Sequence, residues 1–164
     1  MSSQAILLAH DLWRKGTGGA PAGLAGQADS FAYAGLDLGL AQFADSTFAG
    51  SSFTATSFRQ ASWTGCRFTG CHFAACDFDG IAITGCSFVG CTFSQARFPA
   101  GRLSGSSFQQ CEWDDVDFDG GHWTDVLVRQ CTGTRVRAHA LQGQRVDFTG
   151  SFFEQLEFHG ANIN

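Results

Sequence analysis

A period of five residues constrains the fold of this chain more than any other feature of its sequence. From Phe43 to Phe118, every fifth position holds an aromatic or large aliphatic residue, without a break. Neither an α-helix, with 3.6 residues per turn, nor a β-strand, whose side chains alternate, produces this spacing. A short period that persists over so much of a chain indicates a repeat architecture in which each unit stacks on the next.

A second position, two residues before each large one, holds small or sulfur-containing side chains. All seven cysteines of the chain occupy this phase: Cys66, Cys71, Cys76, Cys86, Cys91, Cys111 and Cys131. The other three phases contain mostly Ser, Thr, Asp, Arg, Gln and Gly. We therefore expect two inward positions in every five, one large and one small, along a solenoid with a continuous core.

Three blocks of the sequence resemble a known family: SFTAT (52–56), ACDFDG (75–80) and GCSFVGCTF (85–93). They are similar to the repeats of pentapeptide-repeat proteins, which have a large residue at the centre and a small one two positions earlier. The resemblance covers residues 31–164 and implies an all-β fold, a right-handed quadrilateral β-helix with four pentapeptides per coil. It implies nearly seven coils, a rod roughly 30 Å long at a strand spacing of about 4.8 Å. The fold hosts many unrelated functions and specifies none of them.

The chain divides into two predicted regions. Residues 1–30 are expected to form an N-terminal cap and a linker, and residues 31–164 the β-helix. A short helix or flap over residues 2–15, with Ser2 or Ser3 as N-cap, would cover the open end of the first coil. Residues 16–30, rich in Gly and Ala, are predicted to be a flexible linker.

The repeat weakens between Val126 and Val146. There the central positions become small, while the normally small phase becomes larger; the central residues are Val128, Gly133, Ala138 and Gly143. Volume is thereby passed from one inward phase to the other, as close packing requires. The pattern leaves two alternatives open: a thinner but regular coil, or a distorted coil that shapes a binding surface.

Composition and charge limit the possible partners. A net charge of −5 argues against nucleic acid or an anionic membrane as a direct partner, because both select for basic surfaces. No apolar run approaches the roughly 18 residues of a membrane span, and the N-terminus does not resemble a secretion signal. An odd number of inward cysteines without C-x-x-C spacing is typical of reduced core thiols. We expect a cytoplasmic protein.

No motif predicts catalysis, a cofactor or a metal. Asp115, Asp117 and Asp119 match the first half of a calcium loop, but the twelfth position is Val126, where the loop requires a bidentate Glu. The histidines lie outside the inward phases and are expected to be exposed: His10, His72, His122, His139 and His159. A filled solenoid has no central pocket for a substrate. The sequence therefore predicts a non-enzymatic protein without a cofactor.

Charged residues gather on one predicted side of the solenoid. The position before the large residue reads Asp77, Arg97, Asp117, Arg137 and Glu157 on successive coils. We predict that this side binds a protein partner through Asp77, Asp79, Arg97, Glu112, Asp114, Asp115, Asp117, Asp119 and Arg137. The alternative is a solvated face on which neighbouring charges pair with each other.

The last coil provides a second candidate interface. Phe152, Phe153, Phe158 and Ile163 would form an apolar patch of the kind that marks an interaction site. We expect this end to be covered, either by a second copy in a homodimer or by the ligand protein.

The resemblance leaves three functions open. First is an immunity or antitoxin protein that neutralises a toxic, DNA-acting enzyme, as pentapeptide-repeat proteins do beside bacterial type VI secretion effectors. The alternative is a DNA-mimicking topoisomerase (gyrase) protector similar to the quinolone-resistance pentapeptide proteins, and the third is a generic interaction scaffold. No insertion breaks the five-residue register, no helix follows the last repeat, and Arg97 and Arg137 interrupt the acidic track. These departures favour the immunity role.

Overall fold

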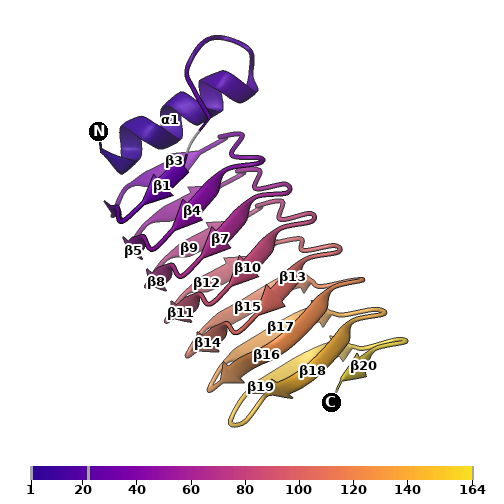
Figure 1. Ribbon diagram of the computed structural model, residues 1–164. Helices are drawn as coiled ribbons and strands as arrows, with labels where there is room; N and C mark the ends of the chain where they lie inside the picture. The colour runs from indigo at the N-terminus through magenta and orange to yellow at the C-terminus, as the bar shows by residue number, and fades with distance from the viewer. Residues whose placement is uncertain (1, 22, 164) are drawn as a thin grey trace.

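The computed structural model describes residues 2–21 and 23–163, and it confirms a β-solenoid with one short helix at its N-terminal end. The helix α1 (Ser3–Arg14) lies across the first coil, and the described chain ends at the opposite end of a stack of about seven coils (Figure 1). Met1 and Asn164, the outer ends of the two predicted regions, lie outside the described residues. Among the described residues, no helix is long and apolar enough to span a membrane.

Four sides make up each coil, and strands on successive coils pair in parallel. The first side contains β1 (Gly23–Ala25), β4 (Gln42–Ala44), β7 (Ser62–Thr64), β10 (Ala82–Thr84), β13 (Arg102–Ser104), the start of β16 (His122–Arg129), β18 (Gln142–Asp147) and β20 (Asn162–Ile163). The second contains β2 (Ala28–Asp29), β5 (Thr47–Ala49), β8 (Arg67–Thr69), β11 (Ser87–Val89) and β14 (Ser107–Gln109), and β16 continues onto it. The third contains β3 (Ala32–Ala34), β6 (Ser52–Thr54), β9 (His72–Ala74), β12 (Thr92–Ser94), β15 (Glu112–Asp117), β17 (Thr132–Arg137) and β19 (Phe152–Glu157). The fourth side is held by isolated bridges, beginning with Asp37 to Ser57.

The register confirms the five-residue period, with one exception at the N-terminal end. From the pairing of Ala32 with Ser52 onward, paired residues are separated by four pentapeptides. In the first coil Gly23 pairs with Gln42, so this coil is one residue shorter. The prediction that residues 16–30 form a flexible linker was therefore wrong from Gly23 onward. The connection between β2 and β3 is one residue shorter than in the later coils. Leu24 is therefore out of phase with the later repeats, and the five-residue pattern does not reveal the first coil.

Stacked aromatic rings fill the interior. On the fourth side, the ring of Phe78 lies 5.2 Å from that of Phe58 and 4.3 Å from that of Phe98, with interplanar angles of 6° and 2°. The small phase is buried as predicted, and all seven cysteines are buried and free. The Cys71 thiol donates a hydrogen bond to the carbonyl oxygen of Phe48 at 3.3 Å. Both inward phases thus build one core without disulfides among the described residues.

The weak part of the repeat forms regular coils. Pairing continues without a break from β15 through β17 to β19 and from β16 to β18. The absent side chain at Gly133 is compensated from the next coil, because the Phe153 ring stacks on that of Trp113 at 5.5 Å. Of the two alternatives that the sequence left open, the regular coil is therefore the one that the chain adopts.

Polar contacts attach α1 to the first coils. Ser2 caps the helix by accepting a hydrogen bond from the N–H of Ala5 at 3.2 Å. The prediction that His10 is exposed was wrong: it is 1% exposed, and its Nε2 lies 2.7 Å from the carbonyl oxygen of Gly39. Asp11 accepts a hydrogen bond from the N–H of Asp37 at 2.7 Å. These contacts make the helix a fixed cap on the open end of the solenoid.

Candidate functional site

On the fourth side, mostly charged residues form one column that runs along the coils, and we call it the charged column. It consists of residues at equivalent positions on successive coils, joined by parallel pairing: Asp37, Ser57, Asp77, Arg97, Asp117, Arg137 and Glu157. The structure therefore brings together residues that lie four pentapeptides apart in the sequence. The position after each large residue adds Asp79 and Asp119, and the third side adds Glu112, Asp114 and Asp115.

Arg137 pairs along the column with Asp117, whereas Arg97 and Arg59 pair across positions. Arg97 Nη2 lies 3.2 Å from Asp115 Oδ1, at the corner with the third side. Arg59, which the sequence analysis did not single out, lies 3.6 Å from Asp77 and 3.2 Å from Asp79. These side chains are partly exposed, so each pair contributes only about 0–1 kcal/mol to stability. Their effect is to fix where the charges lie.

Asp117 is the most buried acidic residue of the charged column, and its carboxylate accepts hydrogen bonds from both backbone and side chain. Its side chain is only 12% exposed, Oδ1 accepts the N–H of Asp119 at 2.7 Å, and Oδ2 accepts from Arg137 Nη2 at 2.9 Å. The sequence placed Asp117 in an outward phase, but its carboxylate is mostly buried. The same hydrogen bond from the N–H two residues later forms at Asp77, which is 41% exposed, so the feature that distinguishes Asp117 is its contact with Arg137 of the next coil. Burial is the largest effect on this group and raises its pKa.

Asp119 accepts hydrogen bonds from two groups on the next coil. Its Oδ1 accepts the N–H of His139 at 2.8 Å, and its Oδ2 lies 3.1 Å from Arg137 Nη2. Burial alone would raise the pKa of Asp119, but these hydrogen bonds outweigh it and hold the pKa below the usual value. Two carboxyl groups therefore share the single guanidinium group of Arg137.

A groove of about 470 Å³ opens where the third and fourth sides meet, over the last three coils and Arg97 of the coil before them. Its lining combines charged and apolar groups: Arg97, Asp115, Val116, Asp117, Arg135, Arg137, Gln155, Leu156 and Glu157. The corner residues among them have left-handed backbone conformations, with φ of 57° at Asp115, 56° at Arg135 and 54° at Gln155. At earlier coils this corner holds Gly35, Ala55, Ala75 and Gln95. Long polar side chains at this corner therefore begin at Gln95, one coil before the first corner residue of the groove, and the residue type at the corner does not by itself locate it.

On the third side, Glu112 and Asp114 are exposed on β15. Arg135, from the next coil, forms an ion pair with Asp114. A second exposed pair lies away from this side, at the corner between the first and second sides, where Arg145 Nε lies 2.5 Å from Asp125 Oδ1. Asp114 and Asp125 are similarly exposed, at 51% and 53%, and so provide a matched comparison.

The last coil exposes large apolar side chains at two positions of β19. Phe152 is 65% exposed, whereas Phe153, Phe158 and Ile163 are half-buried against the core. Leu156, which the sequence analysis did not single out, is 40% exposed and also lines the groove. The strand β19 therefore contributes Leu156 to the groove and Phe152 to the apolar end.

Two family models match the chain, and both describe the same repeat. "Pentapeptide repeat region" matches residues 61–137, and "Pentapeptide repeats (8 copies)" matches residues 37–74. Together they cover more than half of the sequence, in the part that forms the regular coils. The chain belongs to the pentapeptide-repeat family, whose members are typically non-catalytic scaffolds.

Among the solved structures that the chain resembles are a fluoroquinolone resistance protein and two pentapeptide-repeat proteins from cyanobacteria. QnrB1, a plasmid-mediated fluoroquinolone resistance protein, is 16% identical, with 84% of this chain and 72% of QnrB1 covered and a TM-score of 0.40. Rfr23, from the cyanobacterium Cyanothece 51142, is 8% identical, with 99% and 100% covered and a TM-score of 0.32. HetL, from the cyanobacterium Nostoc sp. strain PCC 7120 and involved in heterocyst differentiation regulation, is 11% identical, with 85% and 88% covered and a TM-score of 0.31.

At these identities and TM-scores, the similarities do not indicate what the chain binds. A comparison with curated protein sequences finds no match. The function must therefore be argued from the surface of this chain.

Proposed function

We propose that this protein is a non-catalytic binding protein of the immunity or antitoxin type, which holds a basic surface of a toxic enzyme against its charged side. The observation that carries the proposal is the excess of carboxylates over arginines on the charged side as a whole, fixed on a rigid coil; the groove within it is lined by three of each. Enzymes that act on DNA hold phosphates with Lys and Arg, and a surface of ordered carboxylates is complementary to such a site. Complementary charge chiefly raises the association rate and the specificity.

The groove supplies the apolar component that a stable complex requires. Leu156, which is 40% exposed, lies among its charged groups, and Phe152, which is 65% exposed, adds apolar area on the same strand, β19. Protein interfaces commonly combine an apolar centre with a polar rim. Because paired strands and stacked rings already hold the coil, binding orders little additional backbone, which reduces the entropic cost of association. We propose that the partner covers both the groove and this apolar end.

A topoisomerase protector that mimics DNA is the less favoured role. Such mimicry needs a continuous anionic surface, and Arg59, Arg97 and Arg137 interrupt the acidic residues of the charged column. We further propose a cytoplasmic location, since seven free thiols are typical of a reducing compartment.

The proposal is tested by co-expressing the chain with the product of the neighbouring gene and measuring growth. Asp114→Lys should abolish protection and weaken binding about tenfold or more, which corresponds to about 1.4 kcal/mol. Binding of the parent should weaken as salt is added. Asp125→Lys is the matched control, because Asp125 is similarly exposed and similarly paired but lies away from the groove. Both variants should melt within a few degrees of the parent.

Each result separates the candidate roles. Protection that survives Asp114→Lys, or that is lost equally with Asp125→Lys, would show that the charged side is a solvated face. A chain that gives no protection against the neighbouring product, but does protect cells against a fluoroquinolone, would favour the topoisomerase role instead.

A further inference from the structure

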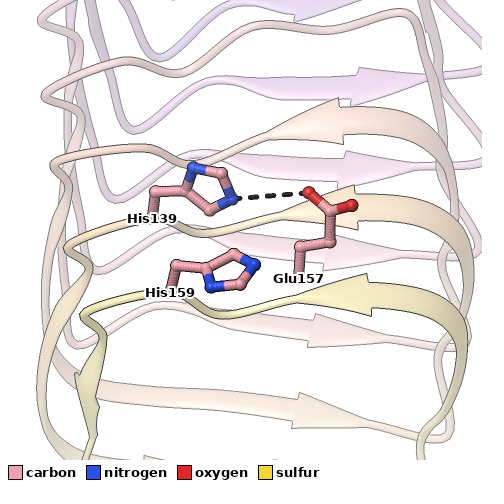
Figure 2. A group of neighbouring side chains, drawn as sticks. All are labelled: His139, Glu157 and His159. Atoms are coloured by element: carbon pink, nitrogen blue, oxygen red, sulfur yellow. Dashed lines mark ion pairs between the residues drawn. The ribbon is translucent and has the colours of Figure 1, made fainter.

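Two histidines and a glutamate converge at one edge of the charged side. His139 follows β17 and His159 follows β19, so they occupy equivalent positions on successive coils, and Glu157 ends β19 (Figure 2). The two imidazole rings are 5.0 Å apart at an angle of 81°. One ligand atom from each of the three residues lies within 4.8 Å of the other two. Figure 2 shows the three side chains directed toward a common space.

The Nε2 atom of His139 is the most constrained atom of the group. It is buried, lies 3.4 Å from Glu157 Oε2 and accepts or donates no hydrogen bond within the described residues. Buried polar atoms nearly always have a partner, so this atom requires an explanation. The backbone N–H of His139 is bound by Asp119 at 2.8 Å, which fixes the base of the side chain. A ring nitrogen held beside a carboxylate and a second imidazole is arranged as a metal ligand is.

The distances match the coordination geometry of zinc. Zn²⁺ binds His nitrogen and carboxylate oxygen at about 2.0–2.2 Å, so two ligands of a tetrahedral ion lie about 3.4 Å apart. The separation of His139 Nε2 and Glu157 Oε2 has this value. His159 is exposed and can complete the site by a side-chain rotation without disturbing the core. Two imidazoles and one carboxylate favour Zn²⁺ and similar transition metals over Ca²⁺ or Mg²⁺, which prefer oxygen ligands alone.

We propose that His139, Glu157 and His159 form a binding site for a divalent transition metal ion, with Zn²⁺ as the expected ion. The ion would join the last two complete coils and leave a fourth position for water or for a side chain of a partner. Glu157 also lines the groove, so the ion would lie at the border of the candidate interface.

Zinc binding can be measured on the full chain without an affinity tag, by titration calorimetry with Zn²⁺ alone. The parent should bind one equivalent, and His139→Ala and His159→Ala should each weaken binding by more than about tenfold, because loss of an outer-sphere partner already costs about 10–100-fold. Glu157→Gln, which keeps the shape but removes the charge, should also weaken it. The matched control is His122→Ala, an exposed histidine on the first side.

A second measurement guards against misfolded variants. Zn²⁺ should raise the melting temperature of the parent and of His122→Ala, because a ligand that binds only the folded state stabilises it, but not that of His159→Ala. Since His159 is exposed, its replacement disturbs no packing. The proposal is overturned if the parent binds no Zn²⁺, if His159→Ala binds as well as the parent, or if His122→Ala loses affinity equally. The isolated chain is used, so the result does not depend on whether the protein neutralises a toxin.

Discussion

Removal of one ring from the central coils should cost far more than removal of the same ring from the last coil. Phe78 is fully buried and stacks on Phe58 at 5.2 Å and on Phe98 at 4.3 Å. Phe78→Ala should reduce the free energy of unfolding by about 3–5 kcal/mol, from lost burial and from the cavity that remains. Backbone hydrogen bonds of 2.7 Å, from the N–H groups of Phe58 and Phe78 to the coils that follow, keep these coils from collapsing into the cavity. We therefore expect the upper half of that range.

The matched control is Phe158→Ala. Phe158 occupies the position equivalent to that of Phe78, but on the last coil. Phe158 is half-buried and lies next to Ala138, and among the described residues no ring contact involves it. Its truncation should cost less than half as much as Phe78→Ala.

Both variants can be compared by urea and thermal unfolding followed by circular dichroism. At about 2–4 °C per kcal/mol for a chain of this size, Phe78→Ala should lower the melting temperature by roughly 8–20 °C. Equal losses of unfolding free energy at the two positions, or a loss below about 1 kcal/mol for Phe78→Ala, would refute the inference that stacked rings stabilise the central coils.

Two further predictions concern Gly133 and the N-terminal cap. A Cβ at Gly133 would lie 2.5 Å from Phe153 Cδ1, so Gly133→Ala should destabilise the chain in urea unfolding by about 1–3 kcal/mol. In a Phe153→Ala background the same substitution should cost clearly less, because the clashing ring is gone. Strictly additive losses would contradict the steric explanation. Burial alone would raise the pKa of Asp11, but hydrogen bonds from Lys15 and from the N–H of Asp37 outweigh it and lower the pKa. The stabilisation from Asp11 is therefore complete above its unfolded pKa of about 3.9 and is lost as the pH falls through the lower folded pKa. Asp11→Asn should remove this acid-dependent loss from melting curves recorded below neutral pH, and an unchanged pH profile would show that the contact does not stabilise the cap.

The sequence alone determined the solenoid, its two inward phases and the positions of its buried cysteines. Each of these properties depends on a rule that every pentapeptide obeys separately, namely a large residue inward and a small one two positions earlier. A register that repeats without a break from Phe43 to Phe118 also places the charged column, because residues on successive coils must then lie beside each other. Local pattern and global packing agree in these coils, and the pattern could be read directly.

Only the tertiary structure decided the features that depend on the contacts between neighbouring coils. The first coil is one residue shorter, which moved Leu24 out of the visible pattern, and His10 is buried because α1 lies over that coil. Asp117 is mostly buried although it lies in an outward phase, and Arg137 of the next coil contacts its carboxylate. His139 and His159 look like isolated surface residues in the sequence and meet only because one coil lies on the next. Periodicity specifies which residues share a column, but the contacts of their side chains depend on corner conformation and on the size of the neighbours above and below.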